Sequence, residues 1–200
     1  MANRFRGVLG EVISEAQSAF TGRLISDNVI LGLECIHALR NRKRKVGSVA
    51  LKFDMSKACD RVEWVFLERM IAKLGFSKGW ISRVMRCVTS VSFSFLLNGE
   101  IYRKLKPARG LRQGDPLSPY LFIICAEGLS SVLNVTVNDN VISGFQCNRA
   151  GPIVSHLLFA YDSLQFASAT SEDCLAIMKI MDDYTGASGQ LINFDKSAFV

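Results

Sequence analysis

Apolar residues recur over much of the chain at the three- and four-residue spacing of amphipathic helices. Ile30, Leu33 and Ile36, for example, fall on one side of the first such segment. Ser171 is expected to cap the last helix and Gly186 to end it. The periodic segments are about 27–41, 58–74, 78–89 and 171–184, and a further segment, 117–134, is apolar enough to be buried. The pattern therefore predicts a helix in each of these segments.

Shorter apolar runs bounded by turn residues predict strands. They cover residues 47–53, 91–97, 101–105, 156–159 and 163–166, and residues 189–200 are typical of a turn followed by a short strand. The dipeptide Asn98-Gly99 is a strong hairpin signal. A second tight hairpin is predicted around Ala160-Tyr161-Asp162, with its acidic residue at the tip. Because helices and strands alternate irregularly, we expect one α+β domain of two lobes, with helices behind an antiparallel sheet.

Composition is typical of a globular protein with one large core, since 49% of the 200 residues are hydrophobic and 21% are charged. The purely apolar stretch at residues 121–126 is far too short to span a bilayer, and no secretory signal is evident at the start. The six cysteines are scattered without a Cys-x-x-Cys pair, which argues against zinc and favours reduced thiols. We therefore expect an intracellular protein, nuclear or cytoplasmic, with no membrane partner.

Positive charge is the next informative feature. The net charge is +6, and five of the six residues at 40–45 are Lys or Arg. Such a run favours a polyanionic partner, nucleic acid before an acidic membrane surface. A solvated helix end and a nuclear-import signal stay open as other interpretations of this run.

Residues 108–119 read ARGLRQGDPLSP, which is an unusual composition for a simple turn. Glycine lets a backbone approach a ligand closely, and arginine offers a fork for phosphate. Pro116 and Pro119 rigidify the entry to the following helix. Since turn chemistry explains only part of this composition, we expect the loop to meet a ligand.

Two acidic residues, Asp54 and Asp162, stand directly after apolar strands. A carboxylate at a strand end is held by a rigid element while it stays open to a metal ion. Mg²⁺ takes one or two such carboxylates and leaves room for substrate phosphates. Together with the loop at 108–119, the two acids favour phosphoryl or nucleotidyl transfer.

Four segments resemble, in order, the catalytic motifs of reverse transcriptases from plant non-LTR retrotransposons (long interspersed nuclear elements). They are residues 50–64 (ALKFDMSKACDRVEW), 109–119 (RGLRQGDPLSP), 156–163 (HLLFAYDS) and 188–197 (SGQLINFDKS). Residues 13–28 are similar to the fingers region of the same family. The resemblance covers nearly the whole chain.

The resemblance implies a right-hand polymerase fold. About residues 1–48 would belong to the fingers, and about residues 49–200 mostly to the palm, with finger insertions. The implied reaction is RNA-directed DNA synthesis on an RNA template and a DNA primer, from deoxynucleoside triphosphates. Two divalent ions, Mg²⁺ or Mn²⁺, are implied as cofactors.

Site residues follow from the resemblance position by position. Asp54 would ligate both metal ions, with the Met55 carbonyl nearby, and Asp162 matches the second acid of the third motif. Arg23 in the fingers is a candidate for reaching a triphosphate. The other matched residues are Gln113 and Gly114, which would line the pocket for nucleotide and template, and Lys196, which would act near the leaving pyrophosphate.

Two positions depart from the family pattern. The third motif should read Phe-Ala-Asp-Asp, but Tyr161 replaces its first Asp, the acid that pairs with Asp54 on the metals. A phenol of pKa about 10 brings no anion near neutral pH, and its ring adds bulk at the ion site. This substitution predicts impaired catalysis and weakened metal binding. Cys59 stands where the family generally has Tyr or Phe, which predicts weaker discrimination between sugars.

Two other functions stay open beside an active polymerase. One is a non-catalytic retroelement relic that binds nucleic acid through its basic face, and the other is a different metal-dependent phosphotransferase built on the same acids. The chain stops soon after the fourth motif, so we expect no thumb, a fragment of a longer polyprotein, and a weak grip on template and primer.

Overall fold

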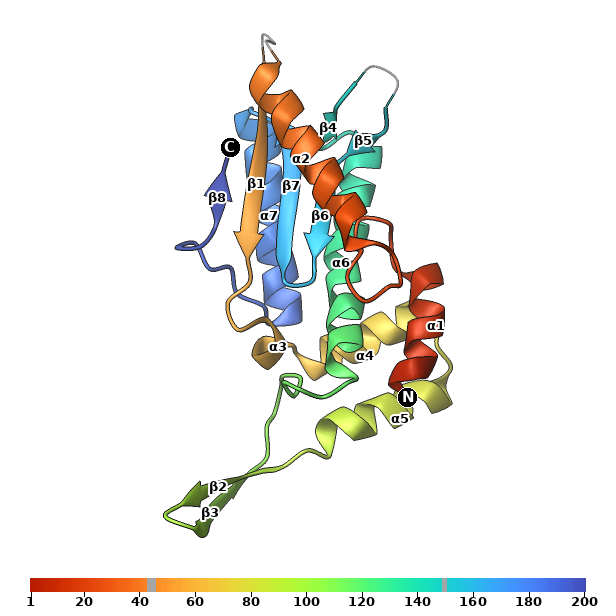
Figure 1. The fold of residues 1–200 in the computed structure, drawn as a ribbon, viewed down its shortest axis with the longest axis vertical. Helices are drawn as coiled ribbons and strands as arrows, with labels where there is room; N and C mark the ends of the chain where they lie inside the picture. Colours follow the sequence, from red (N-terminus) through yellow and green to blue (C-terminus); the bar gives the residue numbers. More distant parts are fainter. Residues whose placement is uncertain (43–45, 149–150) are drawn as a thin grey trace.

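A four-stranded antiparallel sheet forms the centre of the protein (Figure 1), in a computed structural model that describes residues 1–42, 46–148 and 151–200. Its strand order is β6-β7-β1-β8. The bounds are β1 Ser48–Asp54, β6 His156–Phe159, β7 Asp162–Ser168 and β8 Ala198–Phe199. Because the two longest strands, β1 and β7, pair along their full length, the ends of both strands are held in a fixed relation.

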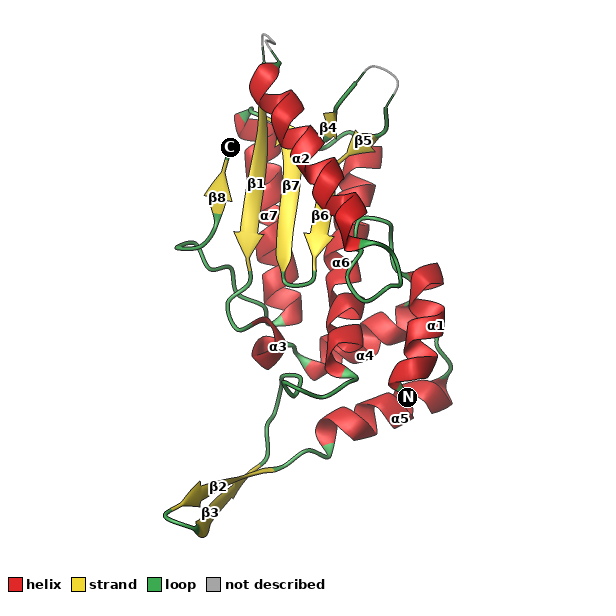
Figure 2. Cartoon of the chain, viewed as in Figure 1, coloured by secondary structure: helices red, strands yellow, loops and turns green. Residues whose placement is uncertain are grey.

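Helices cover both faces of this sheet (Figure 2). The long helices α6 (Ser118–Asn138) and α7 (Ser171–Ser188) lie behind it, and α2 (Ile25–Asn41) crosses its front. The larger core joins Phe53 and Ala167 of the sheet to α6 and α7. A smaller core joins Ala50 and Phe166, on the opposite face, to Cys35 of α2. This arrangement confirms the predicted α+β fold of helices packed on an antiparallel sheet.

The lower part of the molecule is helical and basic. Helices α1 (Ala2–Val12) and α4 (Trp64–Lys73) pack against α6, and α5 (Lys78–Thr89) packs against α4. The hairpin β2 (Phe93–Leu97) and β3 (Glu100–Leu105) projects beyond them (Figure 1). The hairpin turns at Asn98-Gly99, as predicted, with φ of 50° and 86°. The remaining pair is β4 (Phe145–Gln146) with β5 (Ile153–Val154). By length and composition α6 could cross a membrane, but 56% of its most apolar window is buried in the protein.

Several predicted boundaries were wrong, for identifiable local reasons. Thr170, rather than Ser171, caps α7, because its side chain accepts a hydrogen bond from the Asp173 amide at 3.2 Å. The helix runs past Gly186 and ends at Gly189, which has φ of 76°. The predicted acidic hairpin tip is also wrong, since the β6–β7 turn is Ala160-Tyr161 and Asp162 is the first residue of β7. The sequence pattern gave no indication of α1.

The helix predicted over residues 58–74 is in fact two helices, α3 (Ala58–Arg61) and α4. A loop from elsewhere in the chain donates hydrogen bonds to the carbonyls at the break. The Gly110 amide donates to the Val62 carbonyl and the Leu111 amide donates to the Cys59 carbonyl, both at 2.8 Å. The Trp64 indole returns a bond to the Gly110 carbonyl at 2.8 Å. These tertiary hydrogen bonds replace helical ones and explain the interruption.

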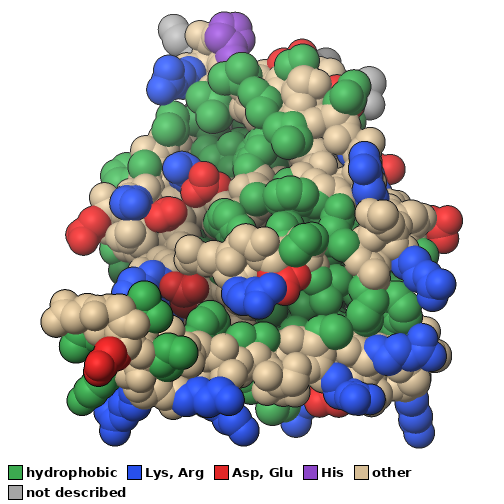
Figure 3. All heavy atoms as spheres, turned by 60° about the horizontal axis from the view of Figure 1, so that its bottom comes forward, with side chains coloured by type: hydrophobic (Ala, Val, Ile, Leu, Met, Phe, Trp, Pro, Cys, Tyr) green, Lys and Arg blue, Asp and Glu red, His purple; other side chains and the backbone are tan. Residues whose placement is uncertain are grey.

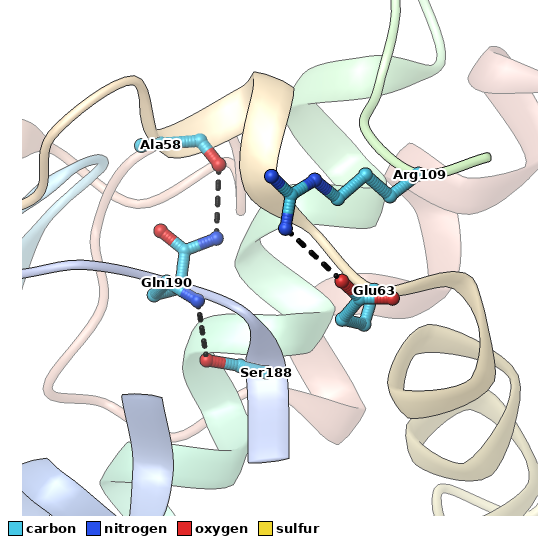
Figure 4. Close-up of polar contacts among 5 residues, drawn as sticks. All are labelled: Ala58, Glu63, Arg109, Ser188 and Gln190. Carbon is cyan, nitrogen blue, oxygen red and sulfur yellow. Dashed lines mark hydrogen bonds and ion pairs between the residues drawn. The ribbon is translucent and has the colours of Figure 1, made fainter. Parts of the chain in front are cut away.

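A second loop reaches the same break from the other side (Figure 4). The Glu63 amide donates to the Ser188 carbonyl at 2.9 Å, and the Gln190 side-chain amide donates to the Ala58 carbonyl at 2.9 Å. An Arg109–Glu63 ion pair at 3.4 Å adds an exposed contact. We call residues 58–63, 109–111 and 188–190 the loop junction. Three of the four motif segments therefore meet at one place.

Two glycines make this close approach possible. A Cβ on Gly110 would lie 2.6 Å from the Asp60 carbonyl oxygen, and one on Gly189 would lie 2.5 Å from the Arg61 carbonyl oxygen. Both glycines also have positive φ, 91° and 76°, a region that L side chains avoid. Neither position can take a side chain without movement of the backbone of α3.

Replacement of either glycine by alanine is expected to destabilise the protein. We expect Gly110→Ala and Gly189→Ala each to lower the free energy of unfolding by about 2–4 kcal/mol, from the clash and the positive φ together. Gly186→Ala is the matched control, because a Cβ there meets nothing within 4 Å and alanine favours the helix. Chemical denaturation measures all three, and Gly110→Ala as stable as Gly186→Ala would contradict the account.

A buried polar network ties α6 to the sheet and to the loop after α1. His156 is 3% exposed, and its two ring nitrogens lie 2.7 Å from the Ser130 and Ser155 hydroxyls. Ser130 contacts the Ser14 hydroxyl at 2.7 Å, and the Ser14 amide donates to the Glu127 carboxylate at 2.9 Å. His156 is therefore a buried packing residue of β6, and burial lowers the pKa of His156 to about 4.

This buried histidine predicts a specific loss of stability in mild acid. Because the folded-state pKa of His156 lies below its ordinary value of 6.5, its contribution is present above pH 6.5 and is lost as the pH falls toward 4. Between pH 7 and pH 5 the protein should lose about 2 kcal/mol more than the His156→Gln variant. Denaturant titrations at both pH values test this, and equal losses in the two proteins would refute it.

Candidate active site

A cavity of about 620 Å³ opens where the end of β1, α3, the loop before α6 and the β6–β7 turn come together. It is lined by Asp54, Met55, Lys57, Ala58, Cys59, Gln113, Gly114, Asp115, Pro116, Ser118, Pro119 and Tyr161. Five of the residues selected from the sequence, together with Tyr161, thus share one cavity wall. The sequence reasoning missed Lys57, whose position three residues after Asp54 was the available signal.

Asp54 is the acidic centre of this cavity. It is the last residue of β1, and its backbone is fixed by the segment that follows α7. Its carbonyl accepts a hydrogen bond from the Asn193 amide at 2.8 Å, and its amide donates to the Ser197 hydroxyl at 3.3 Å. The neighbouring Met55 forms an isolated antiparallel β-bridge with Ile192. The fourth motif segment therefore holds the strand end that presents the carboxylate.

Asp162 lies directly opposite Asp54 in the β1–β7 register, but it does not line the cavity. Its carboxylate instead pairs with the Lys52 ammonium at 3.5 Å. Both side chains are about half exposed, at 42% and 48%, so the pair adds little stability in water. The second acid of the pattern is therefore paired with a cation outside the cavity wall. Lys196, in the exposed turn after Asn193, also lies outside the cavity wall.

Tyr161 occupies the wall beside Asp54. The ring packs edge-on against Phe122, with centroids 4.7 Å apart, and its hydroxyl lies 3.4 Å from the Cys59 sulfur. Burial and the Cys59 contact raise the pKa of Tyr161 to about 12. The phenol is therefore neutral near pH 7. Burial likewise raises the pKa of the Cys59 thiol.

The loop at 108–119 is braced by its own side chains. The Gln113 amide donates to the Asp60 carboxylate at 3.3 Å. Asp115 pairs with Arg112 at 3.1 Å and accepts a hydrogen bond from the Leu117 amide at 2.9 Å. Asp115 therefore orients a backbone amide of this loop. Gln113 and Gly114 face the cavity on a loop whose shape the α3 segment fixes.

Arg23 binds backbone carbonyls in this structure. Its guanidinium donates to the carbonyls of Gly10, Ile13, Ser14 and Gln17, at 2.6–3.1 Å. Three of these carbonyls belong to the last turn of α1 and the residues just after it, where helix carbonyls need partners. Both terminal nitrogens of Arg23 are thus engaged by the backbone of the fold, and its role as a triphosphate ligand stays a prediction.

Positive charge is concentrated on one segment that the sequence reasoning overlooked. Residues 69–112 carry ten Lys or Arg and a single acid, Glu100, and all ten cations are exposed. The signal was the imbalance of charge over α4, α5 and the β2–β3 hairpin. Figure 3 shows Lys and Arg side chains along the lower edge of the face that it draws. Of the basic run at 40–45, residues 43–45 lie outside the described residues.

The whole chain, residues 1–200, matches the family described as reverse transcriptase (RNA-dependent DNA polymerase). The chain belongs to this family, so the predicted family is confirmed. An uncharacterized mitochondrial protein of Arabidopsis thaliana is 45% identical over 69 residues, which are 34% of this chain and 57% of that protein. The uncharacterized 149 kDa protein of transposon TX1 from Xenopus laevis is 27% identical over 98% of this chain and 14% of its own length.

Other relatives are Pol polyproteins of retrotransposable elements. The Pol polyprotein of a type-1 retrotransposable element R2 from Popillia japonica is 33% identical over 54% of this chain and 17% of the polyprotein. Among solved structures, apo telomerase from Candida tropicalis superimposes with a TM-score of 0.70 at 14% identity, over all of this chain and 39% of that one. This likeness confirms the polymerase fingers-and-palm fold. The chain spans between about one seventh and little more than half of these curated relatives.

Proposed function

We propose that this chain is the polymerase centre of a plant non-LTR retrotransposon, which holds an RNA template and a DNA primer but extends the primer slowly. One observation carries the proposal: the cavity that unites Asp54, Gln113 and Gly114 has Tyr161 where the family pattern has a metal-binding acid. Family membership supports the reaction class. The boundary between fingers and palm near residue 48 remains a prediction.

Nucleic-acid binding is supported by the charge of residues 69–112. Ten exposed cations against one acid give a surface that attracts phosphate, and such contacts make affinity fall steeply with salt. The segment lies next to the cavity, because the loop at 109–112 follows the β2–β3 hairpin and joins the cavity wall at Gln113. A polyanionic strand on this surface would therefore run toward Asp54.

The roles within the cavity follow from its lining. Gln113 and Gly114 would contact the incoming nucleotide and the template, and Cys59 would face the sugar. Lys196 would meet the leaving pyrophosphate only after the turn that carries it moves toward the cavity. Lys57, which lines the cavity, supplies a nearer cation for phosphate.

The donor atoms around Asp54 do not fit two divalent ions. Mg²⁺ and Mn²⁺ select carboxylate, carbonyl and water oxygens. Two carboxylates line the cavity, and one of them, Asp115, is paired with Arg112 and accepts a hydrogen bond from the Leu117 amide. The cavity therefore offers the Asp54 carboxylate and the neighbouring Met55 backbone, while Tyr161 is a neutral phenol and Asp162 lies outside the cavity wall, paired with Lys52. Within the described ranges no three His, Cys, Asp or Glu side chains are grouped closely enough to hold a metal. This deficit is the reason we propose impaired catalysis.

Primer extension on an RNA template with Mg²⁺ tests the proposal. Loss of about 4 kcal/mol of transition-state stabilisation slows a reaction about a thousandfold, so Tyr161→Asp should raise the extension rate by roughly that order. Asp54→Asn in the Tyr161→Asp background is the control, and it should abolish the gain. Equal rates in the chain and in Tyr161→Asp would refute the role assigned to the missing acid.

A non-catalytic nucleic-acid-binding relic is the second candidate, and the cation-rich segment favours it equally. Salt-titrated binding of an RNA–DNA duplex separates the two candidates from an inert fold. If the unmodified chain and its Tyr161→Asp variant both bind the duplex with a steep salt dependence and neither extends a primer, the relic is supported. If neither protein binds, both candidates fail.

A further inference from the structure

The two departures from the family pattern lie in contact with each other. Cys59 is on α3 and Tyr161 is in the β6–β7 turn, 102 residues later, yet the sulfur and the phenol oxygen are 3.4 Å apart. Cys59 is only 9% exposed, so its neighbours leave little free space around the thiol. A contact this close means that the volume of one side chain limits the volume of the other.

The Tyr161 ring is held on two sides. Phe122 of α6 packs edge-on at 4.7 Å between centroids, and the Cys59 thiol meets the hydroxyl end. The turn itself aims the ring, because Ala160 adopts φ of 54° and makes the two-residue connection between β6 and β7. Even so, Tyr161 is 41% exposed and its exposed part faces the cavity that contains Asp54.

We propose that Tyr161 and Cys59 act as a pair that forms the aromatic wall of the nucleotide cavity: the small thiol leaves the space that the ring fills, and the ring contacts the bound nucleoside triphosphate. The inference rests on the proposed function, since it assumes that this cavity takes a nucleotide. In this arrangement the residue that limits the cavity beside Asp54 comes from the β6–β7 turn and not from α3.

Either substitution made alone should destabilise the protein. An aromatic residue at 59 would compete with Tyr161 for one space, and overpacking of a buried site is destabilising. A small residue at 161 would leave a void against Cys59 and Phe122, with loss of their contacts. Exchange of the two side chains preserves both the composition and the total volume, so the exchanged protein should recover what each single variant loses.

A double-mutant cycle with this exchange tests the pairing. We expect Cys59→Tyr and Tyr161→Cys each to lower Tm by about 4–8 °C, and the protein with both changes to recover at least half of the summed loss. Tyr102→Cys is the matched control, because Tyr102 is 64% exposed on the distant hairpin and its effect should simply add to that of Cys59→Tyr. Additive losses for Cys59→Tyr and Tyr161→Cys would overturn the pairing.

Binding of a fluorescent deoxynucleoside triphosphate analogue to the full chain tests the wall. Tyr161→Cys should weaken affinity at least fivefold, Tyr161→Phe should retain it, and the exchanged protein should recover part of the loss. Unchanged affinity in Tyr161→Cys would overturn the role of the ring. If the unmodified chain fails to bind the analogue at all, the proposed function and the wall both fall, whereas the stability cycle still decides whether the two residues are paired.

Discussion

The site depends on the close backbone contact at the loop junction. Gly110 and Gly189 approach the carbonyls of α3 so closely that a Cβ would lie 2.5–2.6 Å from them. That approach lets the loops at 109–111 and 188–190 hydrogen-bond to the interrupted helix on both sides of residues 58–63. The same three segments continue to Asp54, Cys59 and Gln113. The hydrogen bonds of the junction therefore fix the backbone of the cavity wall in the absence of a ligand.

The cavity combines a preserved frame with an altered centre. Its frame follows the reverse transcriptase fold, as the superposition on telomerase indicates at low sequence identity. At its centre the Asp54 carboxylate lies beside a neutral phenol, while Asp115 is paired with Arg112 and the opposite acid, Asp162, is paired with Lys52. The fold of the cavity depends on backbone hydrogen bonds, whereas its chemistry depends on the identity of a few side chains. The chemistry can therefore change while the fold stays the same. Loss of an acid can therefore leave the fold intact.

Much of this arrangement could be predicted from the sequence. Hydrophobic periodicity located the main helices, and the Asn98-Gly99 dipeptide located the hairpin. The motifs located Asp54, Cys59, Gln113 and Gly114, which share the cavity. Long-range contacts escaped prediction, because local spacing does not encode them. The break between α3 and α4 arises from hydrogen bonds donated by Gly110 and Leu111. Arg23 donates hydrogen bonds to carbonyls at the end of α1. The contact of Cys59 with Tyr161 joins segments 102 residues apart.

Mn²⁺ titration followed by electron paramagnetic resonance tests the central claim most directly, because it counts metal ions without any need for primer, template or turnover. The account predicts that the chain binds Mn²⁺ at least about tenfold more weakly than Tyr161→Asp, which is about 1.4 kcal/mol, and that Asp54→Asn removes the tighter binding of that variant. If the unmodified chain binds Mn²⁺ as tightly as Tyr161→Asp, the centre has the oxygen donors it needs, and the account of an impaired metal site is contradicted.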